Sequence, residues 1–372
     1  MALNSDVSTR SRERTVTTQV IIIGKGLAGL ALSFLLSKKQ IPHVVLGRKE
    51  KGPLLALGET LPPSALPLLQ STGLLSVFEK TALRKTTGYH SCWGSPITTD
   101  HNFYFNRPIQ HGLKLNKASL LLALEEMQQL HVDHFERSIS TTIEDCPRVV
   151  LDGEKTIESQ LIVDATGRKR QLCKSLGIGQ IEEDELMAFS CHQKLVKLPR
   201  LPHGVFVEPF EKGWGIVSQL SDEQQVMTLF THKGEAASFS DFANWKDILE
   251  NTVHLKEFLD DRPPHKVIGA KANTSRPIQC AGANWLAIGD AAMAFDPLSS
   301  HGITSAVYTA SQAAKAIESR LDDAASPAFM DYDVQLKKIY AAYYEQKLQL
   351  YRQETRWKDS GFWAEMRRES VV

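Results

Sequence analysis

A glycine-rich turn between an apolar segment and a helical one constrains this chain most. Val20–Ile23 is a run of β-branched residues, and residues 24–29 after it read Gly-Lys-Gly-Leu-Ala-Gly. In a dinucleotide-binding turn, the first glycine allows a tight turn, the second lets the backbone approach a pyrophosphate, and the third lets helix and strand pack closely. We expect a helix over Leu27–Lys38 with its N-terminus facing the phosphates. The sequence therefore predicts a dinucleotide-binding unit at residues 20–38.

The strand expected next, over residues 43–46, lacks one feature of this unit. An acid at its end usually holds the ribose hydroxyls, but here Gly47 and Arg48 occupy that place and the nearest acid is Glu50. Two arrangements stay open. Either Glu50 reaches back to the ribose, or Arg48 and backbone groups bind the adenosine end.

Two further apolar segments also run into glycine-containing loops. Residues 160–163 precede Asp164-Ala165-Thr166-Gly167, and residues 285–288 precede Gly289-Asp290-Ala291-Ala292. Continuous apolar strands of this kind are typical of a parallel sheet that binds its ligand at the carboxyl edge. We expect one such sheet, built from the start, middle and end of the chain.

The intervening segments have a different pattern. Short β-rich runs separated by Gly, Pro, Ser and Asp turns predict an antiparallel sheet over residues 186–196, 204–209, 213–220 and 225–232. Helical periodicity covers residues 118–130, 300–320 and 329–355. The predicted fold class is α/β, or α+β overall. We expect a discontinuous dinucleotide-binding domain (16–57, 110–178 and 276–325), a substrate domain (58–109 and 179–275), a C-terminal helical extension (326–372) and a flexible tail (1–15).

Composition excludes several classes of protein. The 43 basic and 43 acidic residues balance, which argues against a nucleic-acid binder. No apolar stretch is long enough to span a membrane. The five cysteines are never two or three residues apart, so we expect buried thiols in a reducing cytoplasm rather than disulfides or a zinc ribbon. The histidines show neither His-x-x-x-His nor His-Glu-x-x-His spacing, so we expect no metal site.

Four motifs in series resemble those of flavoprotein monooxygenases with the single-component fold and of flavin-dependent halogenases. After the turn at 24–29 come Gly58-Glu59-Thr60-Leu61-Pro62-Pro63, the Asp-Ala-Thr-Gly at 164–167, and residues 289–302, which read Gly-Asp-Ala-Ala-Met-Ala-Phe-Asp-Pro-Leu-Ser-Ser-His-Gly. The resemblance implies FAD as the cofactor. It also implies a Rossmann-type FAD-binding domain of the p-hydroxybenzoate hydroxylase-like kind, with an inserted antiparallel-sheet substrate domain and C-terminal helices.

The resemblance also assigns cofactor contacts. Asp290 would bond the ribitol or phosphate of FAD, and the loop 297–302 would face the pyrimidine edge of the flavin. A helix N-terminus suits that place, because the positive end of the helix dipole stabilises the negative charge of reduced flavin. Lys117 stands where the family usually has an arginine. The lysine keeps the positive charge but lacks the planar guanidinium group that can donate two parallel hydrogen bonds. The residues expected to bind the cofactor are Gly24, Gly26, Leu27, Ala28, Gly29, Arg48, Glu59, Lys117, Asp164, Gly167, Asp290, Pro297, Ser300, His301, Gly302 and Ile303.

Three residues are candidates for catalysis. His301 could donate a proton or shape the oxygen pocket, or it could simply bond backbone at a helix start. Glu59 would lie near the isoalloxazine by the resemblance, or it would cap the helix that follows. Lys85 lies close to the place of the lysine found in halogenases. His90 and Trp214 are weaker candidates for the substrate side.

Several activities stay open within the resemblance. A halogenase would carry a Trp-x-Trp-x-Ile-Pro segment, but residues 212–217 read Lys-Gly-Trp-Gly-Ile-Val. A hydroxylase of a free aromatic molecule matches the fold and cofactor equally well. The Ser-Ser-His-Gly of residues 299–302 and the compact length resemble a narrower group, the LodB/GoxB-type flavoproteins needed to form cysteine tryptophylquinone in amino-acid oxidases. That resemblance implies oxygenation of a tryptophan in a precursor protein, with O2 and an unidentified reductant. The non-enzymatic alternative is a flavin-binding chaperone of the precursor.

Two remaining features concern partners. The chain has no second complete Gly-x-Gly-x-x-Gly, so we expect no separate NAD(P)H-binding domain.

Aromatic residues are concentrated in the last expected helix and just after it. They would either pack that helix against the body of the protein or form a partner surface, and we favour packing. These residues are Tyr332, Tyr340, Tyr343, Tyr344, Tyr351, Trp357 and Trp363.

Overall fold

The computed structural model describes residues 14–48, 56–103, 109–128, 132–135, 139–142, 147–153, 155–194, 203–260 and 266–369. Glu50, Cys146 and most of the predicted tail lie outside these ranges. Within them, every helix is too short or too polar to cross a bilayer.

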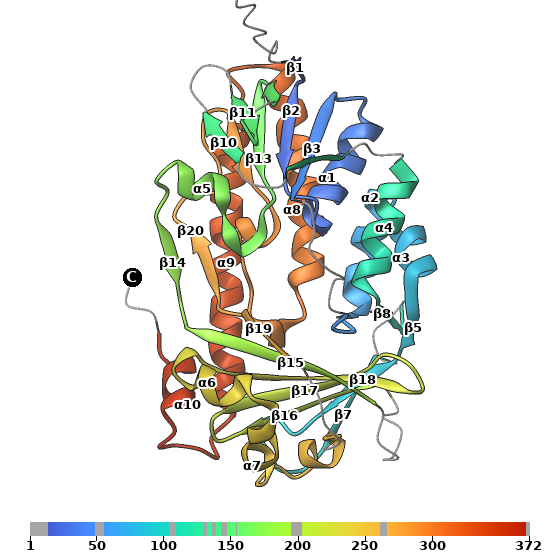
Figure 1. Ribbon diagram of the computed structural model, residues 1–372, viewed down its shortest axis with the longest axis vertical. Coiled ribbons are helices and arrows are strands. Elements are labelled where there is room, and N and C mark those ends of the chain that lie inside the picture. The colour runs from blue at the N-terminus through green and yellow to red at the C-terminus, as the bar shows by residue number, and fades with distance from the viewer. Residues whose placement is uncertain are drawn as a thin grey trace, which may run out of the picture.

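A five-stranded parallel sheet forms the upper half of the molecule (Figure 1). Its order is β21 (Trp285–Ala287), β13 (Leu161–Asp164), β2 (Val20–Ile23), β3 (His43–Arg48) and β9 (Val132–Phe135), and every neighbouring pair is parallel. All four residues of β2 are buried, as expected for a strand covered on both faces. The parallel sheet predicted from the start, middle and end of the chain is confirmed.

Two helices from opposite ends of the chain pack together beside this sheet. They are α1 (Leu27–Lys38) and α8 (Gly302–Asp322), which begins at the last glycine of the 289–302 motif. Three more helices, α2 (Leu66–Thr72), α3 (Leu75–Thr81) and α4 (Lys117–Gln128), lie on the right in Figure 1. A 3₁₀ turn, Pro63–Ala65, precedes α2, and Pro63 suits its first position because its φ is fixed and its missing N–H has no helical partner to lose there.

A seven-stranded sheet crosses the lower half of the molecule (Figure 1). Neighbouring strands are antiparallel except for the parallel pair β16–β6. The antiparallel sheet predicted from the short β-rich runs is therefore confirmed, with extra edge strands. In spatial order the strands are β19 (Val267–Lys271), β15 (Leu186–Lys194), β18 (Gln224–His232), β17 (Gly213–Gln219), β16 (Val205–Phe210), β6 (Gly88–Ser91) and β7 (Thr99–Asn102).

A small antiparallel sheet lies near the right-hand end of the large one in Figure 1. It has the order β4 (Thr60–Leu61), β8 (Gly112–Leu115) and β5 (Ala82–Thr86). Two further sheets complete the strand inventory of the described residues: β1 (Arg14–Thr17), β12 (Lys155–Glu158), β11 (Arg148–Leu151) and β10 (Ile139–Thr142) in one, and β14 (Gln180–Glu182) with β20 (Ser275–Pro277) in the other.

The long helix α9 (Ala328–Gln353) joins the two halves of the molecule (Figure 1). Four of its five tyrosines, Tyr332, Tyr340, Tyr343 and Tyr351, are buried. The packing interpretation of this aromatic stripe is thus confirmed. Further short helices are α5 (Gln171–Ser175), α6 (Ala236–Ser240), α7 (Trp245–Leu249) and α10 (Gly361–Met366). The domain boundaries predicted from the sequence stay a prediction.

Candidate functional site: a flavin cradle at the carboxyl edge of the parallel sheet

The three glycines of the first turn have different surroundings. A Cβ atom on Gly24, whose φ is +120°, would lie 2.2 Å from the carbonyl oxygen of Ala165, and one on Gly29 would lie 1.9 Å from that of Gly24. Gly26 precedes the first turn of α1, and a Cβ there would meet none of the described residues within 4 Å beyond its chain neighbours. The outer glycines are therefore required by close backbone packing, while the middle one borders open space. This is the arrangement that a pyrophosphate at the helix N-terminus needs.

The loop after β13 is held by a fully buried carboxylate. Asp164 Oδ1 accepts hydrogen bonds from the backbone N–H and the hydroxyl of Thr166, at 3.0 and 2.6 Å. Its Oδ2 accepts from the N–H groups of Leu172 and Cys173 at the start of α5. Asp164 thus shapes the turn that carries Gly167, beside which a Cβ would again meet open space.

Two arginines that the sequence reading missed fix the loop after β21. Arg170 is buried, and it donates to the carbonyl oxygens of Ala291 (3.1 Å), Asp290 (3.2 Å) and Ser275 (2.8 Å). Arg168 Nε lies 3.5 Å from Asp290 Oδ2. The Asp290 side chain is 37% exposed, so its carboxylate is available to a ligand. The only signal in the sequence was the Gly-Arg-Lys-Arg that follows β13.

The loop 297–302 leads directly into the N-terminus of α8. Ser300 has a left-handed φ of +54°. In the part of the chain that the structure describes, a Cβ on Gly302 would meet nothing within 4 Å outside its own helix and chain neighbours. His301 is exposed, and its Nδ1 lies 2.5 Å from the carbonyl oxygen of Ser299. Pro297 is also exposed, and Ile303 is half-buried. The helix N-terminus expected at this loop is therefore present.

Buried side chains from α9 and the seven-stranded sheet support this loop. Asp296 Oδ1 accepts from the N–H of Leu298 at 2.8 Å, and Asp296 Oδ2 accepts from the Tyr351 hydroxyl at 2.8 Å. Tyr351 in turn accepts from Trp214 Nε1 at 3.0 Å, and the Tyr343 hydroxyl accepts from the Asp296 N–H at 2.6 Å. Burial raises the pKa of Asp296 to about 6. The tyrosines of α9 thus position the loop, a role that the sequence reading did not foresee.

A buried lysine that the sequence reading also missed lies between the small sheet and the large one. Lys114 on β8 is fully buried. Its ammonium donates to Ser218 Oγ on β17 and lies 3.4 Å from Thr60 Oγ1 and 3.5 Å from the carbonyl oxygen of Gly204. Burial, followed by the nearby Arg84 guanidinium, lowers the pKa of Lys114 to about 7, against the opposing effect of the Glu59 carboxylate.

The negative charge of the Glu59 carboxylate acts on the Lys114 ammonium. Glu59 Oε2 is buried without a hydrogen-bond partner among the described residues. A buried carboxylate oxygen is normally hydrogen-bonded, and the described residues leave this one open to a ligand. Lys85 is placed differently. It is exposed and lies opposite Leu113 in the strand pair, whereas Arg84 lies opposite Lys114. Because neighbouring residues of a strand face opposite sides, Lys85 projects away from Lys114.

The remaining predicted cofactor contacts lie at the ends of strands and helices of the parallel-sheet half. Arg48 is exposed at the end of β3, and Lys117 is half-exposed at the first residue of α4. Because β2, β13 and β21 are adjacent, the structure brings together the glycine turn, the Asp164–Gly167 loop and the Asp290 turn. Leu27 and Ala28 are buried in the first turn of α1.

Comparisons with known proteins agree with this geometry. Residues 17–343 match the family described as FAD binding domain. The FAD-dependent oxidoreductase LodB of Marinomonas mediterranea is 25% identical, over 92% of this chain and 95% of LodB. The flavin-dependent halogenase CmlS superposes with a TM-score of 0.81 at 21% identity, over 96% of this chain and 68% of CmlS. QhpG, a peptidyl tryptophan dihydroxylase essential for tryptophylquinone cofactor biogenesis, superposes with a TM-score of 0.76 at 20% identity, over 94% of this chain and 79% of QhpG.

The chain belongs to the FAD-binding-domain family. It is an FAD-dependent oxidoreductase related to LodB and, in fold, to QhpG and the flavin-dependent halogenases. The residues present are suited to the cofactor, because the open space beside Gly26, Gly167 and Gly302 lies where a ligand can approach the backbone closely.

Proposed function

We propose that this protein is an FAD-dependent monooxygenase that oxygenates a tryptophan side chain of a precursor protein. The reaction would be a step in the maturation of cysteine tryptophylquinone in an amino-acid oxidase. The observation that carries this proposal is the similarity to LodB over nearly the whole length of both chains. QhpG, which has a related fold, is a peptidyl tryptophan dihydroxylase, and this activity supports the proposal.

The residues of the glycine turn 24–29, the Asp290 turn and the loop 297–302 have distinct roles in this proposal. Gly26 admits the pyrophosphate, while Gly24 and Gly29 allow the close backbone packing of the same turn. Asp290, positioned by Arg168 and Arg170, bonds the ribitol or phosphate. The loop 297–302 presents the α8 N-terminus to the flavin ring. FAD, when bound, supplies the activation of dioxygen. The predicted domain division, with residues 16–57, 110–178 and 276–325 holding FAD, is part of the same proposal.

Lys114 and Glu59 are proposed to face the reacting groups. Glu59 Oε2 has no partner among the described residues, and burial lowers the pKa of the Lys114 amine to about 7. A buried pair of this kind can hold or pass a proton without admitting bulk water. His301 and Lys85 remain the other proposed catalytic residues. His301 lies at the loop that would contact the flavin.

The halogenase alternative has one observation in its favour, the TM-score of 0.81 with CmlS. The residue nearest to the halogenase tryptophan segment, Trp214, is buried, stacked on Phe230 at 3.9 Å and bonded to Tyr351. Trp214 therefore packs the core beneath the loop rather than facing a ligand. A small-molecule hydroxylase or a flavin-binding chaperone would use the same cofactor, and only the fate of the substrate distinguishes them from the proposed enzyme.

The partner in this proposal is the precursor of a quinone-dependent amino-acid oxidase, with O2 and a reductant that stays unidentified. The proposed compartment is the cytoplasm. It is supported by the four cysteines of the described residues, Cys92, Cys173, Cys191 and Cys280, which are all buried and unpaired.

The test combines the FAD-loaded protein with the unmodified precursor, a chemical reductant and ¹⁸O₂, followed by peptide mass spectrometry. The proposal expects ¹⁸O in one tryptophan, and no label when that tryptophan is replaced by Phe. Reactions with added bromide and with free tryptophan serve as the comparison arms. Brominated product would indicate a halogenase, labelled free tryptophan would indicate a small-molecule hydroxylase, and precursor binding without label would indicate a chaperone.

A further inference from the structure

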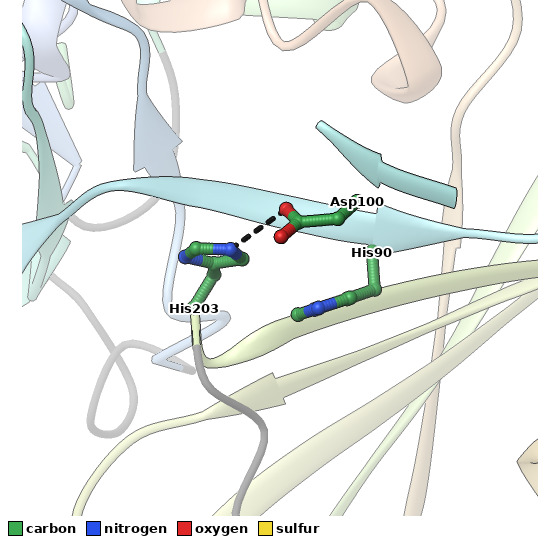
Figure 2. Close-up of side chains that lie close together, drawn as sticks. All are labelled: His90, Asp100 and His203. Carbon is green, nitrogen blue, oxygen red and sulfur yellow. Dashed lines mark hydrogen bonds and ion pairs between the residues drawn. The ribbon is translucent and has the colours of Figure 1, made fainter. Parts of the chain in front are cut away.

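Two histidines and an aspartate converge at the edge of the seven-stranded sheet (Figure 2). His90 on β6 lies directly opposite Asp100 on β7 in the antiparallel pair. His203 lies two residues before β16, the strand that pairs with β6 on its other side. Directly opposed residues of a strand pair share one face, with Cβ atoms about 5 Å apart. The topology thus brings together three residues that are far apart in the sequence.

The distances within this cluster are short. One nitrogen or oxygen ligand atom from each residue lies within 4.8 Å of the other two. His203 Nε2 and Asp100 Oδ1 are 2.8 Å apart, and the centroids of the two imidazole rings are 4.8 Å apart. Ligand atoms around a tetrahedral Zn²⁺, each about 2.0–2.2 Å from the ion, lie roughly 3.3–3.6 Å apart. The His203–Asp100 pair would therefore open slightly, and more widely separated ligand atoms would move together, when the ion binds.

The surroundings of the cluster are also those of a ligand site. His203 Nδ1 lies 2.8 Å from the Thr87 hydroxyl, which can accept the Nδ1 proton in a hydrogen bond. Nε2 bonds Asp100 Oδ1, and a metal ion would replace the proton between these two atoms. The Thr86 hydroxyl donates to the His203 carbonyl oxygen at 3.0 Å and fixes its backbone. His90 Nδ1 is buried and has no hydrogen-bond partner among the described residues. The Asp100 side chain is 53% exposed against 8% for His203, so an ion can enter from the carboxylate side.

We propose that His90, Asp100 and His203 bind a borderline divalent metal ion, Zn²⁺ in the first instance, with water in the remaining coordination positions. Two imidazoles and one carboxylate are a ligand set typical of such ions. The ion would clamp the edge strand β7 to the segment before β16. The next residue of that segment is Gly204, whose carbonyl oxygen lies beside Lys114. By fixing this segment, the ion would also fix the position of the Gly204 carbonyl oxygen next to the proposed catalytic lysine.

His101 provides a matched control within the same strand. It follows Asp100 directly and so faces the other side of β7. Its ring stacks on Tyr89 at 4.4 Å, and its Nε2 lies 2.8 Å from Ser91 Oγ. His101→Gln removes a histidine from the same strand without removing a proposed ligand.

The experiment titrates ZnCl₂ by calorimetry into the FAD-loaded, tag-free full chain after treatment with a chelator. We expect a single saturable Zn²⁺ per chain, and the same site should give the visible absorption bands of low-coordinate Co²⁺. Asp100→Asn and His203→Gln should each weaken binding by about tenfold or more, while His101→Gln leaves it unchanged. Zn²⁺ should also raise the Tm of the wild type but not that of Asp100→Asn.

Two results would overturn the proposal. One is the absence of saturable one-to-one binding in the wild type, and the other is equal binding by the wild type and Asp100→Asn. Asp100 is half-exposed on an edge strand, so its variant is expected to fold. Its flavin absorbance and far-UV circular dichroism check this directly. The outcome is independent of the proposed oxygenation, because it needs neither reductant nor precursor.

Discussion

The Lys114 ammonium donates a hydrogen bond to Ser218 Oγ, and Ser218 in turn donates to the carbonyl oxygen of Gly58 at 2.7 Å. The first residue belongs to the small sheet, the second to the seven-stranded sheet, and the third to the Gly-Glu motif. A single buried amine thus links the three segments around Glu59. Its lowered pKa, about 7, follows mainly from this burial.

Replacing Lys114 with Met should leave a yellow protein that makes little product. Methionine keeps most of the volume but removes the amine, and a proton-transferring side chain typically contributes about 10²–10⁴-fold to a rate. The measurement is ¹⁸O incorporation into the precursor per flavin, together with release of hydrogen peroxide. The matched control is Lys80→Met, which removes an exposed amine from the last turn of α3. Lys85→Met is made beside it, because Lys85 is the other proposed catalytic lysine; full loss in that variant, with Lys114→Met active, would instead favour Lys85.

Gly26→Val should abolish FAD binding without unfolding the protein. Apart from its two chain neighbours, the described residues place no atom within 4 Å of the added Cβ, so the side chain would project into the space assigned to the pyrophosphate. The measurement is the ratio of flavin absorbance to protein absorbance after purification and after addition of FAD. Gly361→Val is the control, because Gly361 also starts a helix and its Cβ also meets nothing within 4 Å. A yellow Gly26→Val protein would contradict the assignment of this turn.

The parts of the fold that could be predicted are those in which local pattern and burial coincide. β2, β13 and β21 are apolar runs that end in glycine-containing loops, because strands covered on both faces need no alternation. The loop 297–302 and α8 could also be predicted from local sequence. The helix starts at Gly302, the last residue of the recognisable motif 289–302.

The supporting residues could not be predicted, because their partners are far away in the chain. Lys114 alternates with Leu113 and Leu115, a pattern that is typical of a half-exposed strand, and only Ser218, 104 residues later, shows that it is buried. His90 and His203 likewise have no local metal-binding spacing. Their convergence depends on the parallel pairing of β6 with β16, which no short motif encodes.

Tyr351→Phe should destabilise the protein by about 1–3 kcal/mol, the cost of leaving a buried polar group unsatisfied. The change removes the hydroxyl that bonds both Asp296 and Trp214. The measurement is the free energy of unfolding in urea. Tyr344→Phe is the control, since its hydroxyl bonds the Arg368 carbonyl oxygen at 3.3 Å at an exposed site. Equal effects of the two changes would mean that the link from Trp214 to the loop adds no stability.

Asp296 should give the protein a stability that falls as the pH rises from about 4 to about 6. Burial, reinforced by the neighbouring Asp184 carboxylate, raises the pKa of Asp296 from 3.8 to about 6, against the opposing effects of Lys347 and of the hydrogen bonds from Leu298 and Tyr351. In this window the folded protein holds a proton that the unfolded chain has released, so each added pH unit lowers the free energy of unfolding by about 1.4 kcal/mol. The contribution is complete below about pH 4 and is lost above about pH 6.

Asp296→Asn tests this titration, because the amide cannot ionise and its oxygen can still accept from the Leu298 N–H. Urea unfolding of both proteins at several pH values isolates the contribution of this side chain from that of the other carboxylates. The free energy of unfolding of the wild type minus that of the variant should decrease through the window by up to about 3 kcal/mol. Parallel profiles would show that the Asp296 carboxyl titrates alike in the folded and unfolded chains. The loop over the proposed flavin site would then be held by the tyrosine hydroxyls without a buried, protonated acid beneath it.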